Sequence, residues 1–155
     1  MWRSCCAFVL MMCSAAPAVA AEWWWVSSGG ERPARRIDFI DKSSATTDYS
    51  GRISAWDFTI YEGLTKDGVR KEKALYRFDC RNRTMTLIEL IEFGNNDRLI
   101  KSYSWNSFEQ SENNIAPESV GESKWEFACA SKSKLNGPVS GTPEEFAAMY
   151  FRISD

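Results

Sequence analysis

Short segments in which apolar and polar residues alternate occupy most of the chain between residues 22 and 105. Successive side chains of a strand point to opposite faces, so this alternation predicts half-buried β-strands. In the clearest case Trp56, Phe58 and Ile60 share one face, which indicates a strand with one buried face. The six predicted strands cover residues 22–26, 36–41, 52–61, 76–80, 84–93 and 99–105. The connections between them are short and rich in turn residues, which predicts an antiparallel meander.

After residue 106 the spacing of apolar residues becomes helical. Ser119 followed three residues later by Glu122 matches a capping box, which marks the beginning of a helix. Trp125 and Cys129 lie on one stripe of this helix, together with Gly121 and Ala128. We therefore expect Trp125 and Cys129 to face the core, and we expect the same of Trp56 in the sheet.

A second, shorter helix is predicted after a glycine-rich break at residues 136–141. Thr142 and Pro143 supply a capping residue and a first-turn proline. The apolar residues that follow have helical spacing, and they are Phe146, Met149, Tyr150 and Ile153. The expected fold class is α+β, with an antiparallel sheet of about six strands, one helix packed on a face of the sheet, and a short extra C-terminal helix.

The first 21 residues have the pattern of an export signal. Arg3 precedes an apolar run at residues 5–13, and small residues ending at Ala20 and Ala21 supply a cleavage site. This run is shorter than the roughly 20 apolar residues that span a bilayer, and no later segment comes close. We expect an exported mature protein, periplasmic or at the cell surface, with no integral membrane segment. The predicted organisation is a signal at residues 1–21, a sheet-and-helix domain at residues 22–131, and a loop with a short helix at residues 132–155.

Two of the five cysteines, Cys80 and Cys129, lie outside the predicted signal. An even pair in an oxidising compartment predicts one disulfide, which would attach the first helix to the end of a strand. Two thiolates in a chain without histidine are a poor ligand set for zinc. We therefore expect a structural bridge, with no metal and no cofactor.

The chain has no histidine, and its 19 basic and 21 acidic side chains are nearly balanced. Without histidine the commonest general base is missing, and no spacing singles out two carboxylates for acid–base chemistry. We therefore predict no catalytic residues and a protein that is not an enzyme. The balanced charge also argues against nucleic acid as a partner.

Several segments, in this order, resemble the surface-adhesin protein E-like family of Gram-negative bacteria. These segments are residues 23–25, residues 37–41, Trp56, residues 76–84, residues 116–119 and residues 125–129. The resemblance covers residues 22–131 and implies an antiparallel sheet with a helix tied to it by the two cysteines. It also implies surface adhesion to host matrix and serum proteins. The named member of the family is anchored by a lipid, and we do not expect such an anchor here, because Met12 before Cys13 is not the small residue that normally precedes a lipidated cysteine.

Two groups of residues are candidates for contact with a partner. Aromatic residues are frequent in binding hot spots, and Trp23, Trp24 and Trp25 cannot all be buried if only one sheet face is covered. Basic residues of a predicted hairpin could form one cationic patch, and they are Arg70, Lys71, Lys73, Arg81 and Arg83. The alternative interpretation is that the tryptophans fill the core and the basic residues are solvated charges.

The function expected from these observations is that of an exported, non-enzymatic binding domain whose partner is a protein or an acidic polysaccharide. Pairing with a second copy through a sheet edge, to form a homodimer, is a further hypothesis. The alternative function is that of a periplasmic accessory or enzyme-inhibitor protein. Accessibility to protease on intact cells would favour the first function, and release with the periplasmic fraction would favour the second.

Overall fold

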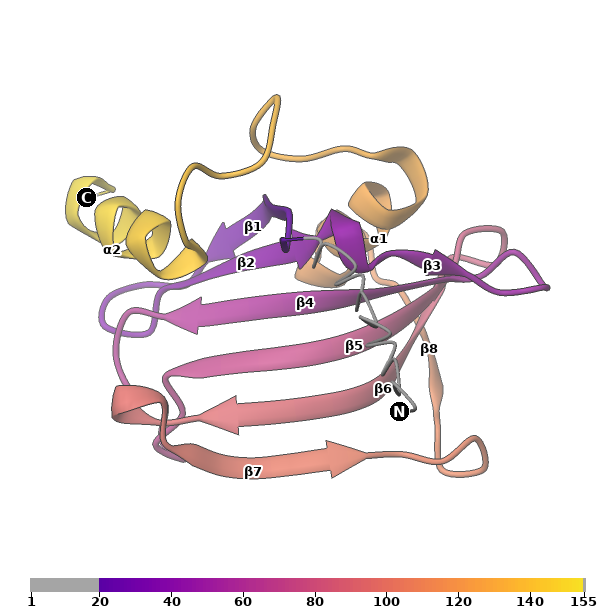
Figure 1. The fold of residues 1–155 in the computed structure, drawn as a ribbon, viewed down its shortest axis with the longest axis horizontal. Helices are drawn as coiled ribbons and strands as arrows, with labels where there is room; N and C mark the ends of the chain where they lie inside the picture. The colour runs from indigo at the N-terminus through magenta and orange to yellow at the C-terminus, as the bar shows by residue number, and fades with distance from the viewer. Residues whose placement is uncertain (1–19, 155) are drawn as a thin grey trace, which may run out of the picture.

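The computed structural model describes residues 20–154, so the predicted export signal lies almost wholly outside the described residues. Residues 20–154 form one antiparallel sheet and two α-helices (Figure 1). The expected α+β class is therefore confirmed. No helix within this part of the chain is long and apolar enough to cross a membrane.

Six strands form the main path of the sheet, in the order β1-β2-β4-β5-β6-β7. Their bounds are β1 Trp23–Gly29, β2 Arg36–Asp41, β4 Ile53–Tyr61, β5 Lys71–Asp79, β6 Thr84–Phe93 and β7 Leu99–Ser104. Two short strands extend the sheet, because β3 (Thr46–Thr47) pairs with β4 and β8 (Glu112–Asn114) pairs with β6. Two 3₁₀ helices, η1 (Lys42–Ser44) and η2 (Asn95–Asp97), follow β2 and β6. The predicted meander is confirmed. The short strands β3 and β8 were not predicted, because two or three residues are too few for alternation to reveal a strand.

Helix α1 (Val120–Ala130) packs on one face of the sheet and is cross-linked to it. The disulfide joins Cys129 of α1 to Cys80 after β5, with a Cα–Cα distance of 5.5 Å. Ser119 caps the helix as predicted, because its hydroxyl accepts a hydrogen bond from the backbone N–H of Glu122. The sequence-based expectation of a disulfide-linked helix is confirmed.

The buried side of α1 is wider than the predicted stripe. Trp125 and Cys129 of that stripe pack against the core, as expected. Lys124 and Phe127 are its buried residues, whereas Trp125 is only half-buried. Trp56, which was also expected in the core, is half-buried and belongs to neither packed cluster of the sheet. The stripe was assigned from apolar side chains, and a lysine buried against charged partners leaves no such signal.

Helix α2 (Pro143–Ile153) covers the opposite face of the sheet. Its residues Ala147 and Phe151 pack against four buried side chains of β2 and β4, namely Ile37, Phe39, Phe58 and Ile60. The predicted second helix is therefore confirmed, with Thr142 as its cap and Pro143 in its first turn. Both faces of β4 are therefore buried, and the expectation of one solvent-facing side is wrong because a different helix covers each face.

Arg35 ties the C-terminal end of α2 to the sheet. Its guanidinium donates hydrogen bonds to both carboxylate oxygens of Glu62, at 2.9 and 2.7 Å, and to the backbone oxygen of Phe151 at 2.6 Å. The hydrogen bond from Arg35 holds the pKa of Glu62 below its usual value. A lowered carboxyl pKa stabilises the fold above the ordinary pKa of 4.5, and this contribution is lost as the pH falls through the lowered value.

Replacing Glu62 with glutamine is expected to remove part of the acid sensitivity of the fold. The wild-type protein should have the higher melting temperature at neutral pH, because only the carboxylate forms an ion pair with Arg35. The difference should shrink as the pH is lowered below 4.5, which melting curves across a pH series would measure. A difference that does not depend on pH would contradict this account. Glu31→Gln, at an exposed residue, is the control.

Candidate functional site

The three adjacent tryptophans of β1 lie between the sheet and the helices. Trp24 points to the α1 side, where its ring centroid is 5.7 Å from that of Phe127. Trp23 and Trp25 point to the α2 side, and Trp25 lies 5.6 Å from the ring of Phe146. All three are half-buried, because both faces of the sheet are covered at this edge. This placement supports a packing role and leaves none of them as the exposed contact residue that was proposed.

The two basic clusters lie at opposite ends of β5. Arg70, Lys71 and Lys73 are at its beginning, whereas Arg81 and Arg83 are in the turn after its end. A nine-residue strand separates these ends by about 30 Å. The single cationic patch expected from the sequence is therefore not formed.

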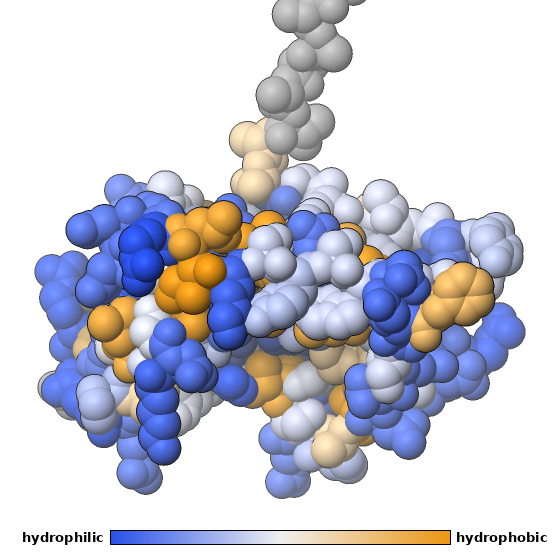
Figure 2. Space-filling view, turned by 90° about the horizontal axis from the view of Figure 1, so that it is seen from below, coloured by the Kyte–Doolittle hydropathy of each residue, from blue (hydrophilic) through white to orange (hydrophobic). Residues whose placement is uncertain are grey.

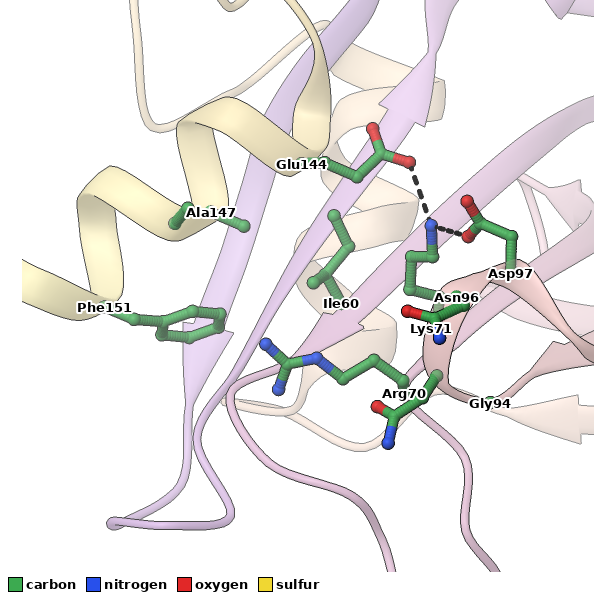
Figure 3. A pocket seen from close by; sticks show the side chains of 11 residues that line it. Ile60, Arg70, Lys71, Gly94, Asn96, Asp97, Glu144, Ala147 and Phe151 are labelled. Atoms are coloured by element: carbon green, nitrogen blue, oxygen red, sulfur yellow. Dashed lines mark hydrogen bonds and ion pairs between the residues drawn. The ribbon is translucent and has the colours of Figure 1, made fainter.

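Within the cluster at the beginning of β5, Lys71 is paired with carboxylates. Arg70 and Lys71 line a cavity of about 320 Å³ between α2, β4 and η2 (Figure 3). The Nζ atom of Lys71 lies 3.3 Å from Glu144 Oε1 and also forms an ion pair with Asp97 (Figure 3). Lys73 is close to an aromatic ring, with its Nζ 5.1 Å from the ring centroid of Phe58. These contacts leave Arg70 as the main cation of the cavity.

The cluster after β5 has mainly a structural role. Arg83 forms an ion pair with Glu122 of α1, and its guanidinium carbon lies 5.3 Å from the Trp125 ring centroid. Arg83 thereby attaches the β5–β6 turn to the helix beside the disulfide. Only Arg81 of this cluster is exposed.

Exposed apolar side chains lie along the edge of the sheet opposite β1. This edge consists of β7 and residues 105–110, and we call it the β7 edge. Leu99 is 56% exposed, Tyr103 is 39% exposed and Phe108 is 98% exposed. The rings of Tyr103 and Trp105 stack, with centroids 5.6 Å apart and an interplanar angle of 15°. Figure 2 views the molecule from the β7 side and shows hydrophobic residues among hydrophilic ones there.

The β7 edge combines an unpaired strand with an anchored loop. Within residues 20–154, β7 pairs with β6 on one side and with no strand on the other. The Gln110 side chain donates a hydrogen bond to the backbone oxygen of Trp105 at 2.9 Å and accepts one from Arg77 at 2.7 Å. The loop that presents Phe108 is therefore held to the sheet. An edge strand of this kind can add a further strand, and exposed aromatic side chains can anchor it.

The sequence predicts the strand at residues 99–105 but not its position at an edge. Edge position depends on which strands pair, and that is decided by contacts far apart in the chain. The feature of the sequence that could have indicated the edge is the weak alternation of apolar and polar residues in this segment. Weak alternation fits a strand without a buried face.

The fold and the cross-link define a disulfide-stabilised α+β domain. The family model described as surface-adhesin protein E matches residues 25–130, from β1 to the last residue of α1. The chain belongs to this family, as the resemblance of the sequence indicated. The matched region includes both cysteines and the β7 edge, and it ends before α2.

One solved structure with a similar chain is crystal form II of Haemophilus influenzae protein E. The two sequences are 12% identical, and the match covers 76% of this chain and 95% of that chain with a TM-score of 0.48. No curated protein matches at a significant level.

Proposed function

We propose that this protein is an exported, non-enzymatic binding domain of the adhesin type, and that it attaches to a protein partner through the β7 edge. The observation that carries the proposal is the group of exposed apolar residues on an unpaired strand, Leu99, Tyr103 and Phe108. Membership of the surface-adhesin protein E family supports the adhesin class and the export.

The chemistry of the β7 edge favours a protein over an acidic polysaccharide. An extended peptide segment could bond to the free side of β7 through its backbone, while aromatic rings supply anchors. The charge on this strand is small, because Lys101 is its only charged residue and its Nζ lies 6.0 Å from the Tyr103 ring centroid. An acidic polysaccharide would require a concentrated cationic surface, and the two basic clusters are far apart.

Replacing Tyr103 and Phe108 together with serine is expected to weaken binding to the protein partner. Loss of an aromatic anchor costs about 2 kcal/mol, which corresponds to roughly a 30-fold rise in Kd. The measurement is surface plasmon resonance of the protein against individually immobilised serum, matrix and bacterial envelope proteins. A protein bound by the wild type, and bound much more weakly by the double variant, would support the proposal.

Tyr49→Ser provides the matched control, because Tyr49 is also an exposed aromatic residue but lies in the β3–β4 turn. It should leave Kd unchanged. Equal losses in the control and the double variant, or unchanged binding by the double variant, would contradict the assignment of the β7 edge. Binding to a second copy of this chain, or to an enzyme of the envelope, would favour the homodimer or the periplasmic accessory function.

A further inference from the structure

A lysine and two aspartates meet in the interior between α1 and the sheet. Lys124 of α1 is 5% exposed, Asp57 of β4 is 2% exposed and Asp38 of β2 is 1% exposed. The Nζ atom of Lys124 lies 2.9 Å from Asp57 Oδ2 and 3.4 Å from Asp38 Oδ1. Three ionisable groups from three elements therefore converge at a site shielded from water.

The hydrogen bonds around these groups are incomplete. The Thr59 hydroxyl donates to Asp38 Oδ1 at 2.8 Å and lies 3.3 Å from Asp57 Oδ2, so it connects the two carboxyl groups. Asp38 Oδ2 and Asp57 Oδ1 have no hydrogen-bond partner, although Arg36 Nε lies 3.7 Å from the first. Buried polar atoms without partners are rare in native proteins and call for an explanation.

The charges in this site are also unbalanced, since two carboxyl groups face one ammonium group. Burial raises the pKa of Asp57 to about 6, against the opposing effect of the Lys124 charge. Burial by itself would lower the pKa of Lys124, but the charges of Asp57 and Asp38 outweigh it and hold that pKa above its usual value. Burying such a set of charges is costly, and a reaction that removes a charge pair would relieve that cost.

We propose that Lys124 and Asp57 condense to form an intramolecular amide bond, with Asp38 as the catalytic carboxylate. The Nζ atom of Lys124 would become bonded to Cγ of Asp57, and one carboxyl oxygen of Asp57 would leave as water. The bond would join α1 to β4, in addition to the disulfide that joins α1 to the end of β5.

Asp38 is placed to move the protons that this reaction requires. It first accepts a proton from the Lys124 ammonium, which leaves a neutral amine with a free electron pair. That pair attacks Cγ of Asp57 and forms the new C–N bond, and Asp38 passes the first proton to the carboxyl oxygen of Asp57 that will leave. The Asp38 carboxylate, free again, takes a second proton from the nitrogen and gives it to the same oxygen, and the C–O bond breaks to release one water molecule. An ammonium and a carboxylate are thus converted into an amide and water, and Asp38 ends as it began.

The geometry supplies the two conditions that favour condensation. The reacting groups are held in contact by packed elements, which replaces an encounter in solution by an intramolecular step. The low exposure of the site excludes the water that would hydrolyse an amide or solvate the starting charges. Condensation also changes Asp57 Oδ1, which has no hydrogen-bond partner. This atom either leaves as water or becomes the oxygen of the new amide.

The test is the intact mass of the purified protein, denatured and with its disulfide reduced, compared with the mass of Lys124→Arg prepared in the same way. An arginine at this position keeps the positive charge but does not form the amide. The wild-type protein is expected to be lighter than its sequence mass by one water molecule, whereas Lys124→Arg should have its full sequence mass. Tryptic digestion should yield one branched peptide that contains both Asp57 and Lys124.

Two further variants separate the reaction from the fold. Lys132→Arg changes a lysine that is paired with Glu126 near the end of α1, and it should keep the loss of water. Asp38→Ala should restore the full mass if Asp38 moves the protons. A wild-type mass without the loss of water would overturn the proposal and leave a non-covalent ion cluster, and this readout does not depend on whether any variant folds. Loss of water that persists in Asp38→Ala would overturn the role of Asp38.

Discussion

Replacing Cys129 with serine is expected to lower the free energy of unfolding by about 4 kcal/mol, because the disulfide closes a loop with a sequence separation of 49. This is a large part of the roughly 5–15 kcal/mol that stabilises a typical domain. The effect arises mainly from the unfolded chain, which gains freedom when the cross-link is absent. Denaturant unfolding of the oxidised wild type and of the variant would measure it.

Three controls accompany this prediction. Cys80→Ser should have the same effect, the double variant should add little, and reduction of the wild-type disulfide should reproduce the loss. The full effect is expected in the Lys124→Arg background, where the proposed amide cannot restrict the same part of the chain. Equal stability with and without reducing agent would show that the disulfide does not stabilise the fold.

Truncating Phe151 to alanine is expected to cost about 3–5 kcal/mol, as for other large buried aromatic residues. Phe151 is buried where α2 packs on the sheet, so its removal leaves a cavity against Phe58 and Ile60. The measurement is again denaturant unfolding. Met149→Ala, on the exposed side of the same helix, is the matched control and should change the stability by much less.

This experiment also tests the predicted division of the chain at residues 131 and 132. The surface-adhesin protein E match ends before α2, and yet α2 contributes side chains to the main core. A single unfolding transition that shifts with Phe151→Ala would show that α2 belongs to the same folding unit. An unchanged main transition would show that α2 is a separable addition.

The strands could be predicted because alternation is a local property of the chain. Trp56, Phe58 and Ile60 do share one face of β4, as their spacing indicates. What covers each face could not be predicted, because the period of a strand carries no information about the element packed on it. For this reason the alternation did not reveal that Asp57, on the other face of β4, is buried.

The candidate contact residues show the same limit. The basic residues from Arg70 to Arg83 are neighbours in sequence, but a strand that keeps its ends about 30 Å apart cannot bring them into one patch. The β7 edge became visible only through strand pairing, because the exposure of Tyr103 and Phe108 depends on what the rest of the chain leaves uncovered.

The sequence by itself determined the order of the main strands, the beginnings of both helices and the pairing of Cys80 with Cys129, because these depend on alternation, capping residues and a count of cysteines. Only the tertiary structure decided that the two helices cover opposite faces, that β7 is an unpaired edge, and that Lys124 meets Asp57 and Asp38. These features join elements far apart in the chain. Long-range packing, rather than any local pattern, therefore places both the candidate binding surface and the buried cluster of Lys124, Asp57 and Asp38.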